Sequence, residues 1–89
     1  MRNILILIDI QNEYISSNRS FYLKGIHPSL ENCKALLIKA RELGWTIAHV
    51  KHLADENSAT FNPKEEFSQF VAEFEPKKGE LVFIKNDRS

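Results

Sequence analysis

The pattern of apolar positions begins with five consecutive aliphatic residues, Ile4 to Ile8, which end at the carboxylate of Asp9. A strand that is apolar on both faces is typical of the middle of a parallel sheet whose two sides are covered by helices. We therefore predict a first strand over residues 3–8. Ligands of such sheets bind at the carboxyl ends of the strands, so Asp9 is predicted to lie where a site can form. A carboxylate that caps a helix or meets one lysine is the plainer interpretation.

A helix is predicted after a polar, loop-like segment that runs from Gln11 to Ile26. Pro28 suits the first turn of this helix, and Gly44 suits the position just past its end. Its apolar face consists of four residues at helical spacing, Leu30, Cys33, Leu37 and Ala40. Cys33 is therefore interpreted as a buried core residue of the helix and not as a nucleophile.

Two more strands and a second helix complete the pattern. Residues 45–50 and 81–84 are apolar runs of strand length, and the second of them ends at Lys85. Residues 62–65 have the composition of a helix start, with Asn as N-cap, Pro at the first position and Glu in a capping box. The apolar face expected for this second helix is Phe67, Phe70, Val71 and Phe74.

Alternating strands and helices indicate an α/β fold with right-handed crossovers and a parallel sheet. The order is strand, helix, strand, helix, strand, within a single domain that spans residues 1–89. Three strands make a small sheet, and the strand from Ile4 to Ile8 has the composition of a central strand although a short sheet leaves it at an edge. The pattern therefore predicts a missing neighbour on one side of that strand.

The composition narrows the possible partners and compartment. The formal net charge is zero and no basic run occurs, which argues against a nucleic-acid interface and against a polybasic membrane anchor. A single cysteine leaves no internal disulfide, and no segment has the pattern of a secretion signal or a transmembrane helix. The sequence therefore predicts a soluble cytoplasmic protein.

Asp9 and Lys85 are the first candidates for chemistry, because both follow or end predicted strands. In a parallel sheet all carboxyl ends lie at one edge, so the two side chains are expected to meet there. A lysine beside a carboxylate provides a proton-transfer group together with positive charge for a developing anion. A structural ion pair is the alternative, and the spacing alone leaves both open.

Three segments, taken together and in this order, resemble the isochorismatase-like cysteine hydrolases. Residues 6–14 resemble the opening signature of that family, in which a hydrophobic residue and an aspartate precede Gln, Asn and an aromatic residue. Residues 40–47 resemble the family's first helix and the turn into its second strand. Residues 76–85 resemble the approach to its catalytic lysine. The family includes nicotinamidases, carbamoylsarcosine-type amidases and isochorismatases.

The resemblance implies a Rossmann-like, three-layer α/β/α fold with a six-stranded parallel sheet. This chain then supplies the first three strands and two helices, which is the N-terminal half of the domain. Asp9 corresponds to the catalytic acid/base and Lys85 to the catalytic lysine. The nucleophilic cysteine of the family follows the fourth strand, outside these 89 residues. Gln11 and Asn12 match the signature and are expected to order the turn around Asp9.

Three more residues are expected to belong to the site. His52, Tyr14 and Phe61 are predicted to line the crevice that takes a small-molecule substrate. Neither a metal nor another cofactor is expected, because the order of residues after the second strand lacks the Asp-x-His pair that nicotinamidases use. His49, three residues before His52, is expected to lie on the sheet. Two histidines at this spacing on a strand face opposite sides and make a poor ligand pair.

The predicted activity is hydrolysis of a small amide or related C–N bond, with the chain alone inactive. Hydrolysis of a vinyl ether, as in isochorismatases, is an alternative within the family. Another is metal-dependent phosphoryl transfer that uses Asp9 with Asp55 or Asp87. A third is a non-catalytic remnant that binds a partner through its sheet edge. If the chain is such a fragment, the edge of the first strand is expected to pair with the rest of its own domain or with a second copy.

Overall fold

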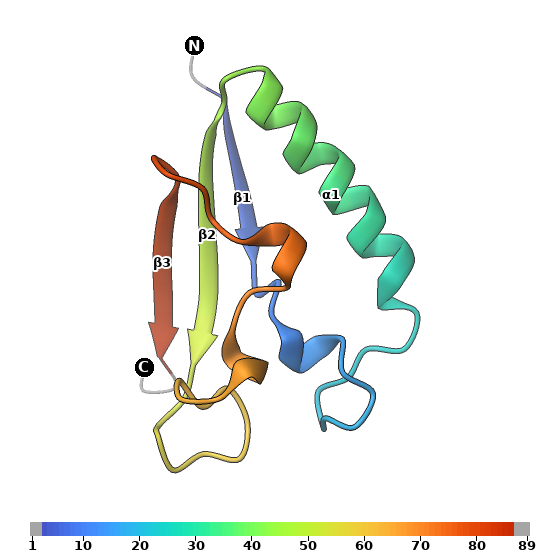
Figure 1. Cartoon of the computed structure of the whole chain (residues 1–89), viewed down its shortest axis with the longest axis vertical. Helices are drawn as coiled ribbons and strands as arrows, with labels where there is room; N and C mark the ends of the chain where they lie inside the picture. Colours follow the sequence, from blue (N-terminus) through green and yellow to red (C-terminus); the bar gives the residue numbers. More distant parts are fainter. Residues whose placement is uncertain (1–2, 87–89) are drawn as a thin grey trace.

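A three-stranded parallel sheet with one long helix forms the frame of the protein in the computed structural model, which describes residues 3–86. The strands are β1 (Ile4–Ile8), β2 (Thr46–Leu53) and β3 (Leu81–Asn86), in the order β1-β2-β3. The helix α1 (Ile26–Glu42) lies over one side of the sheet (Figure 1). The predictions of a parallel sheet, with the first strand at one edge and the third at the other, are confirmed.

Helix α1 begins and ends close to where the sequence predicts. Pro28 lies in its first turn, and Gly25, which precedes the helix, has a φ of 82°. Gly44 follows the last turn with a φ of 73°, a left-handed conformation that glycine adopts without steric cost. Leu37 and Ala40 are buried against the sheet, so the apolar stripe determines which face of the helix is covered.

The second predicted helix is not formed. Residues 62–74 contain only two single-turn 3₁₀ helices, η2 (Glu66–Ser68) and η3 (Ala72–Phe74). The expected cap-type hydrogen bond is present, since the Lys64 N–H donates to Asn62 Oδ1 at 2.9 Å. The chain nevertheless leaves the helical conformation after the first turn. The fold class stands with one α-helix in place of two.

Backbone pairing with the segment that follows β1 explains this difference. The Asn12 N–H donates to the Gln69 carbonyl at 3.0 Å, and the Val71 N–H donates to the Ile10 carbonyl at 3.0 Å. Neither residue is helical, since Gln69 has an extended backbone with a ψ of 159° and Val71 has a ψ of 133°. These long-range hydrogen bonds use the groups that a helix would have paired internally, so tertiary pairing overrides the local helical pattern.

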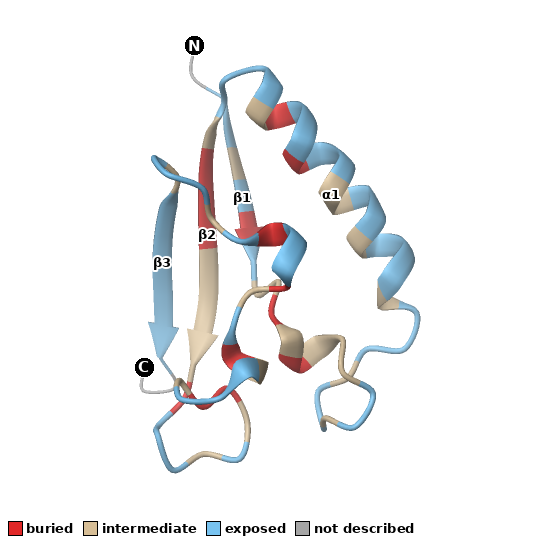
Figure 2. Ribbon diagram, viewed as in Figure 1, coloured by how far each residue is buried: buried red, intermediate tan, exposed pale blue. Residues whose placement is uncertain are grey.

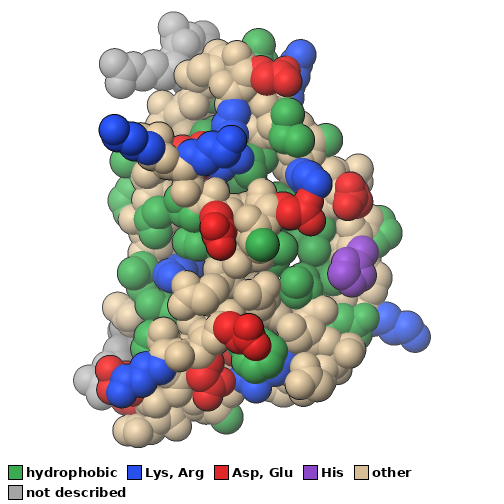
Figure 3. All heavy atoms as spheres, in the orientation of Figure 1, with side chains coloured by type: hydrophobic (Ala, Val, Ile, Leu, Met, Phe, Trp, Pro, Cys, Tyr) green, Lys and Arg blue, Asp and Glu red, His purple; other side chains and the backbone are tan. Residues whose placement is uncertain are grey.

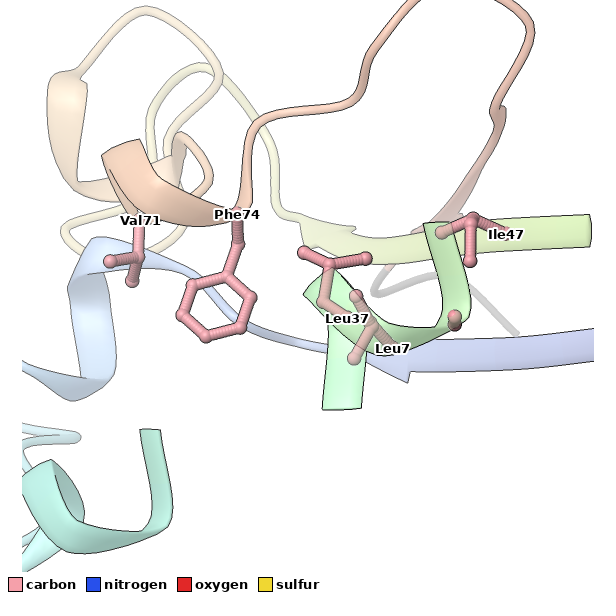
Figure 4. Close-up of a cluster of buried hydrophobic side chains, with 6 residues drawn as sticks. Leu7, Leu37, Ile47, Val71 and Phe74 are labelled. Carbon is pink, nitrogen blue, oxygen red and sulfur yellow. The ribbon is translucent and has the colours of Figure 1, made fainter. Parts of the chain in front are cut away.

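The core lies between α1 and the covered face of the sheet. It is made of Leu7, Leu37, Ala40, Ile47, Val71 and Phe74, all less than a tenth exposed (Figure 4). Fully burying a large aliphatic side chain contributes about 1.5–3 kcal/mol, so this cluster provides most of the stability of the covered side. Cys33 packs against the cluster but is only partly buried, which corrects the prediction that it is a buried core residue.

The opposite face of the sheet is apolar and open. Ile4, Ile6 and Ile8 are each more than half exposed, and every residue of β3 is exposed (Figure 2). The total accessible surface is 6204 Å². A compact monomer of this mass exposes about 5,400 Å², so the chain exposes more surface than its mass alone predicts. We refer to Ile4, Ile6, Ile8, Leu81 and Phe83 as the apolar sheet face, because the strand register places them on one side.

The loops gather at the carboxyl ends of the strands. The segments after β1 and after β2 lie side by side at that end (Figure 1), and η1 (Asn12–Tyr14) contacts η2. Acidic and basic side chains are interspersed with apolar ones on the visible surface, without a large patch of one charge (Figure 3). Within residues 3–86, no helix has the length and apolar character needed to cross a membrane.

Candidate functional site

Asp9 is the first residue after β1 and has an unusual backbone conformation. Its φ is 60°, in the left-handed region, and its N–H donates to the Val50 carbonyl at 2.8 Å. A residue other than glycine in this region costs on the order of 1–3 kcal/mol unless its surroundings hold it there. Here the hydrogen bond to β2 fixes the backbone, so the turn out of β1 presents the carboxylate at the carboxyl edge of the sheet.

Lys85 reaches Asp9 from the other edge strand. Its Nζ lies 3.0 Å from Asp9 Oδ2, across the end of β2. The prediction that these two side chains meet is confirmed. Lys85 is inside β3, one residue before its end, and not past the strand as the pattern indicates. Asp9 Oδ1 is buried and accepts no hydrogen bond from the described residues, so one oxygen of this carboxylate is paired and the other is not.

Gln11 and Asn12 fix the turn that follows Asp9. The Gln11 side chain is fully buried and pairs with the backbone of His52, whose N–H donates to Oε1 at 2.9 Å. Gln11 Nε2 donates to the carbonyls of His52 and Ser68, at 2.8 and 2.7 Å. Asn12 Nδ2 donates to the Glu66 carbonyl at 3.0 Å. The two amides therefore connect the turn to β2 and to η2.

A cavity of about 420 Å³ lies beside Asp9, between β1, α1 and the loop that joins them. Tyr14 and Gln11 contribute polar groups to its wall, and Cys33 is also part of the wall. The other lining side chains are mainly aliphatic residues of β1, α1 and the loop. The pKa of Tyr14 is raised, first by burial and then by the negative charges of Asp9 and Glu13. Tyr14 therefore remains a protonated hydrogen-bond donor near Asp9 at neutral pH.

An aromatic cluster backs this wall. The Phe61 ring lies 5.4 Å from Tyr14, 5.2 Å from Phe21 and 4.9 Å from the His52 ring, measured between centroids. Tyr14 lines the cavity, whereas Phe61 and His52, which were predicted to line the same crevice, are not part of its wall. Phe61 is 4% exposed, so the structure places it behind Tyr14 as packing.

Glu13 and Arg19 form a buried ion pair at this end of the molecule that the sequence did not indicate. Glu13 is fully buried, and Arg19 Nε donates to Glu13 Oε1 at 2.8 Å. The guanidinium also lies over the Phe67 ring, 4.1 Å from its centroid. The sequence places Glu13 directly after Gln11 and Asn12, which is the one local sign of a buried acidic residue. It does not identify Arg19, six residues away, as the partner.

A second carboxylate with little exposure, Glu80, lies at the turn before β3. Arg41 binds it through two hydrogen bonds of 2.7 and 2.8 Å, and His49 Nε2 lies 2.7 Å from its Oε1. The Arg41 guanidinium is the main reason that the pKa of Glu80 is lowered to about 2. His49 lies on β2 as expected and is 1% exposed. Arg41 of α1, His49 of β2 and Glu80 before β3 thus bind one another and connect these three parts of the chain.

Nothing in the described part of the chain gathers three or more His, Cys, Asp or Glu side chains in the way that a metal ion requires. Asp55, a candidate for the phosphoryl-transfer alternative, accepts the Asn57 N–H at 2.9 Å within a turn of the loop after β2. Asp87, the other candidate, lies outside the described residues. His52 contacts Phe61, and His49 binds Glu80.

Comparison with known proteins assigns the chain to a family. The family model of the isochorismatase domain matches residues 3–89. The chain belongs to the isochorismatase family. An uncharacterized isochorismatase family protein of Bacillus subtilis, YddQ, is 31% identical over 87 residues, which are 97% of this chain and 48% of YddQ. This isochorismatase-family chain therefore spans about half the length of the curated relatives it matches.

Solved structures agree with this assignment. An isochorismatase of Pseudomonas putida is 35% identical, with a TM-score of 0.84 over 96% of this chain and 42% of that one. N-carbamoylsarcosine amidase of Thermoplasma acidophilum is 16% identical, with a TM-score of 0.79 over 96% of this chain and 52% of that one, which is a likeness of fold alone. The chain has the α/β fold of the isochorismatase family over about half the length of these structures.

Proposed function

We propose that this chain supplies the proton-transfer aspartate and the lysine of a cysteine hydrolase that cleaves the C–N bond of a small amide. Asp9 is the acid/base, and Lys85 provides positive charge beside it. The nucleophilic thiol comes from polypeptide outside these 89 residues. One observation carries the proposal: Asp9 and Lys85 meet at 3.0 Å at the carboxyl edge of the sheet, and Asp9 keeps a second oxygen without a partner among residues 3–86.

The proposed reaction uses that oxygen twice. Asp9 takes the proton of the thiol as the sulfur attacks the carbonyl carbon, and the C=O π electrons move to oxygen. When the tetrahedral intermediate collapses, the C–N bond breaks and the amine leaves with the proton that Asp9 held. Water then attacks the thioester, its proton passes through Asp9 back to the sulfur, and the carboxylic acid is released. Asp9 and the thiol return to their starting states.

Lys85 and Tyr14 have supporting roles in this scheme. The Lys85 ammonium offsets the charge of Asp9 through Oδ2 and adds positive potential where the oxyanion forms, a type of contribution that mutagenesis puts at about 10²–10³ in rate. Tyr14 lines the cavity beside Asp9 and presents a phenol that stays protonated, since burial raises its pKa. It is proposed to hold the substrate through a hydrogen bond. Gln11 and Asn12 keep the turn in place.

The test is an assay of the protein expressed from its complete coding sequence against a panel of small amides. We expect thiol-dependent release of amine, lost in Asp9→Asn and in a variant that lacks the cysteine of the remaining sequence. Cys33→Ser separates the two thiols. Cys33 is part of the cavity wall, so this variant can change KM, but kcat should stay within a few-fold of the wild type because Cys33 is not the proposed nucleophile. If Cys33→Ser abolishes turnover, or if the enzyme releases pyruvate from a vinyl ether and no amine from any amide, the proposal is wrong.

We also propose that the apolar sheet face and the free edge of β1 are covered by further polypeptide. Ile4, Ile6 and Ile8 are each more than half exposed and every residue of β3 is exposed, so this face offers a continuous apolar surface of the kind that a partner covers. Sedimentation and thermal unfolding of the 89-residue chain test this. We expect self-association or a transition without cooperativity, because several large aliphatics are exposed. A monomer that unfolds cooperatively would contradict it.

A further inference from the structure

Glu13 is a buried charge that the proposed reaction does not use. Its side chain is fully buried, and both of its oxygens are bonded. Oε1 accepts from Arg19 Nε at 2.8 Å, while Oε2 accepts from Arg19 Nη2 at 3.2 Å and from the Phe61 N–H at 2.6 Å. A bidentate guanidinium and a backbone donor together satisfy a carboxylate that would otherwise be costly to bury. Glu13 therefore connects the segment after β1 to the loop after β2.

Phe61 is the residue that this carboxylate holds. Its φ is 52°, a left-handed conformation that bulky side chains rarely adopt. Both of its backbone polar groups are fixed, since the N–H donates to Glu13 and the carbonyl accepts the Ala54 N–H at 2.8 Å. The loop from Ala54 to Phe61 is thus closed at its base, and the unusual conformation of Phe61 is held from two sides.

Arg19 fastens the same loop at a second point. Its Nη2 donates to the Ala59 carbonyl at 2.5 Å and lies 3.9 Å from a carboxylate oxygen of Glu65. Its guanidinium also stacks over Phe67 in η2. One arginine from the loop before α1 therefore contacts two segments that are at least 40 residues further along the chain.

The loop matters to the site through ring packing. Phe61 contacts Tyr14 at 5.4 Å, and Tyr14 lines the cavity beside Asp9. Phe21 packs on the other two rings, at 6.4 Å from Tyr14 and 5.2 Å from Phe61. Tyr14 has no ring neighbour other than these two among the described residues. A shift of Phe61 therefore removes half of the aromatic packing behind Tyr14.

We propose that the Glu13–Arg19 ion pair is a clamp that holds the loop from Ala54 to Phe61 against Tyr14 and so fixes the wall of the site beside Asp9. Glu13 is then a positioning residue for substrate binding. This inference rests on the proposed function for its substrate, but the clamp itself is a property of the loop and is measured without substrate. It adds a specificity determinant that touches neither substrate nor the reacting atoms.

Amide hydrogen exchange of the protein with its complete coding sequence tests the clamp. Glu13→Gln keeps the shape and one acceptor but removes the ion pair, and we expect exchange at Phe61 and Ala54 to rise by about tenfold. Lys64→Gln is the matched control, because it removes an exposed ion pair with Glu56 on the same loop and is expected to leave both amides unchanged. Unchanged exchange in Glu13→Gln would overturn the clamp.

Arg19→Lys keeps the positive charge and loses the bidentate geometry and the stacking. Arg19 is partly exposed, so this variant carries the same test if Glu13→Gln does not fold. We expect exchange at Phe61 between that of the wild type and that of Glu13→Gln. Exchange equal to the wild type in Arg19→Lys, with Glu13→Gln unfolded, would also overturn the clamp.

Steady-state kinetics test whether the clamp positions substrate. We expect Glu13→Gln to raise KM several-fold and to change kcat less, because the wall moves while Asp9 and Lys85 stay in place. Raised exchange with an unchanged KM in an active enzyme would show that the loop does not position substrate, and the inference would be wrong while the proposed function stands. If the wild type cleaves no amide, the proposed function fails, and the exchange result alone decides whether the clamp exists.

Discussion

Two carboxylates in this molecule have opposite environments. Glu80, at the turn before β3, has both oxygens occupied: Arg41 binds each of them, and His49 and the Lys77 N–H add contacts to Oε1. Asp9, after β1, is paired through Oδ2 with Lys85 alone, and its Oδ1 has no partner among residues 3–86. Both carboxylates join distant parts of the chain, but only one has spare capacity to accept a proton.

The comparison sets a carboxylate that connects structural elements against one that we propose takes part in chemistry. The hydrogen bonds from Arg41 lower the pKa of Glu80 to about 2, so at neutral pH it stays an anion that connects α1 to β3. A carboxylate of that kind cannot take and return a proton during a reaction near pH 7. Asp9 accepts a hydrogen bond from one lysine, and its Oδ1 has no partner among residues 3–86, as the proposed proton transfer requires. The predictions below set these two sites against each other.

The largest effect is expected at Asp9. Asp9→Asn removes the proton acceptor and keeps the side chain's size, so turnover in the whole enzyme should fall by about 10³-fold. The free energy of unfolding should change little, because an amide still hydrogen-bonds and tolerates the left-handed conformation. Initial rates together with urea unfolding measure both. If Asp9→Asn lowers the free energy of unfolding but leaves turnover at the wild-type rate, Asp9 has a structural role and the proposed proton transfer is wrong.

Lys85 should come next. Lys85→Met keeps the length of the stem and removes the charge, and we expect kcat to fall by about 10²-fold. Lys85→Arg keeps a charge with different geometry and should recover part of the rate. Single-turnover rates of the two variants give the comparison. Equal rates in Lys85→Met and wild type would leave Lys85 as a surface ion pair without a role in the reaction.

Glu80 is expected to affect stability and not turnover. Glu80→Gln leaves the Arg41 guanidinium and the buried His49 without their anion, so the free energy of unfolding should fall by about 2 kcal/mol. Urea unfolding measures this fall, and the rate per folded molecule should stay at the wild-type value. A loss of turnover as large as that of Asp9→Asn, at wild-type stability, would contradict the structural role.

Acid should weaken the Glu80 site in a defined range. Its pKa is depressed from an ordinary 4.5 to about 2, so its stabilising contribution is fully present above pH 4.5 and is lost as the pH falls towards 2. This group alone should account for about 1–2 kcal/mol of that loss, since solvent screens part of the interaction. Unfolding curves from pH 5 to 2 for wild type and Glu80→Gln should converge at the acid end. Parallel curves would assign the loss to other groups.

The smallest effect is expected for an exposed pair. Lys64 and Glu56 are 70% and 64% exposed, and their 3.3 Å contact should contribute less than about 0.5 kcal/mol. Lys64→Gln should therefore match the wild type in unfolding and in turnover. A larger effect would mean that the loop after β2 is held by the exposed Lys64–Glu56 pair and not by the Glu13–Arg19 pair.

The sequence predicts the parts of this molecule that depend on local pattern. The aliphatic run of β1 and the helical spacing from Leu30 to Ala40 determine which faces are buried, so the strands and α1 lie where they are expected. The meeting of Asp9 with Lys85 was also predictable, because parallel strands bring their carboxyl ends to one edge. The roles of both residues stay predictions until turnover is measured.

Long-range pairing explains what the sequence does not predict. Residues 62–74 have helical spacing, yet the backbone of Gln69 and Val71 pairs with the segment after β1, and no local signal reports that competition. The same holds for Glu80, whose partner Arg41 lies 39 positions away. Phe61 was predicted to line the crevice, but it is buried outside the cavity wall. Its burial depends on a left-handed backbone conformation, which the sequence does not indicate.

The contact between Asp9 and Lys85 spans 76 positions, nearly the whole described chain. During synthesis on the ribosome, β1 and its carboxylate emerge before α1, the loops and β2, and the lysine follows only after those elements have been made. Closing so long a loop costs entropy that grows with its length, so this edge forms after the local structure. The open face of this aliphatic strand stays exposed even after the contact forms, so the strand is vulnerable to aggregation both during and after synthesis.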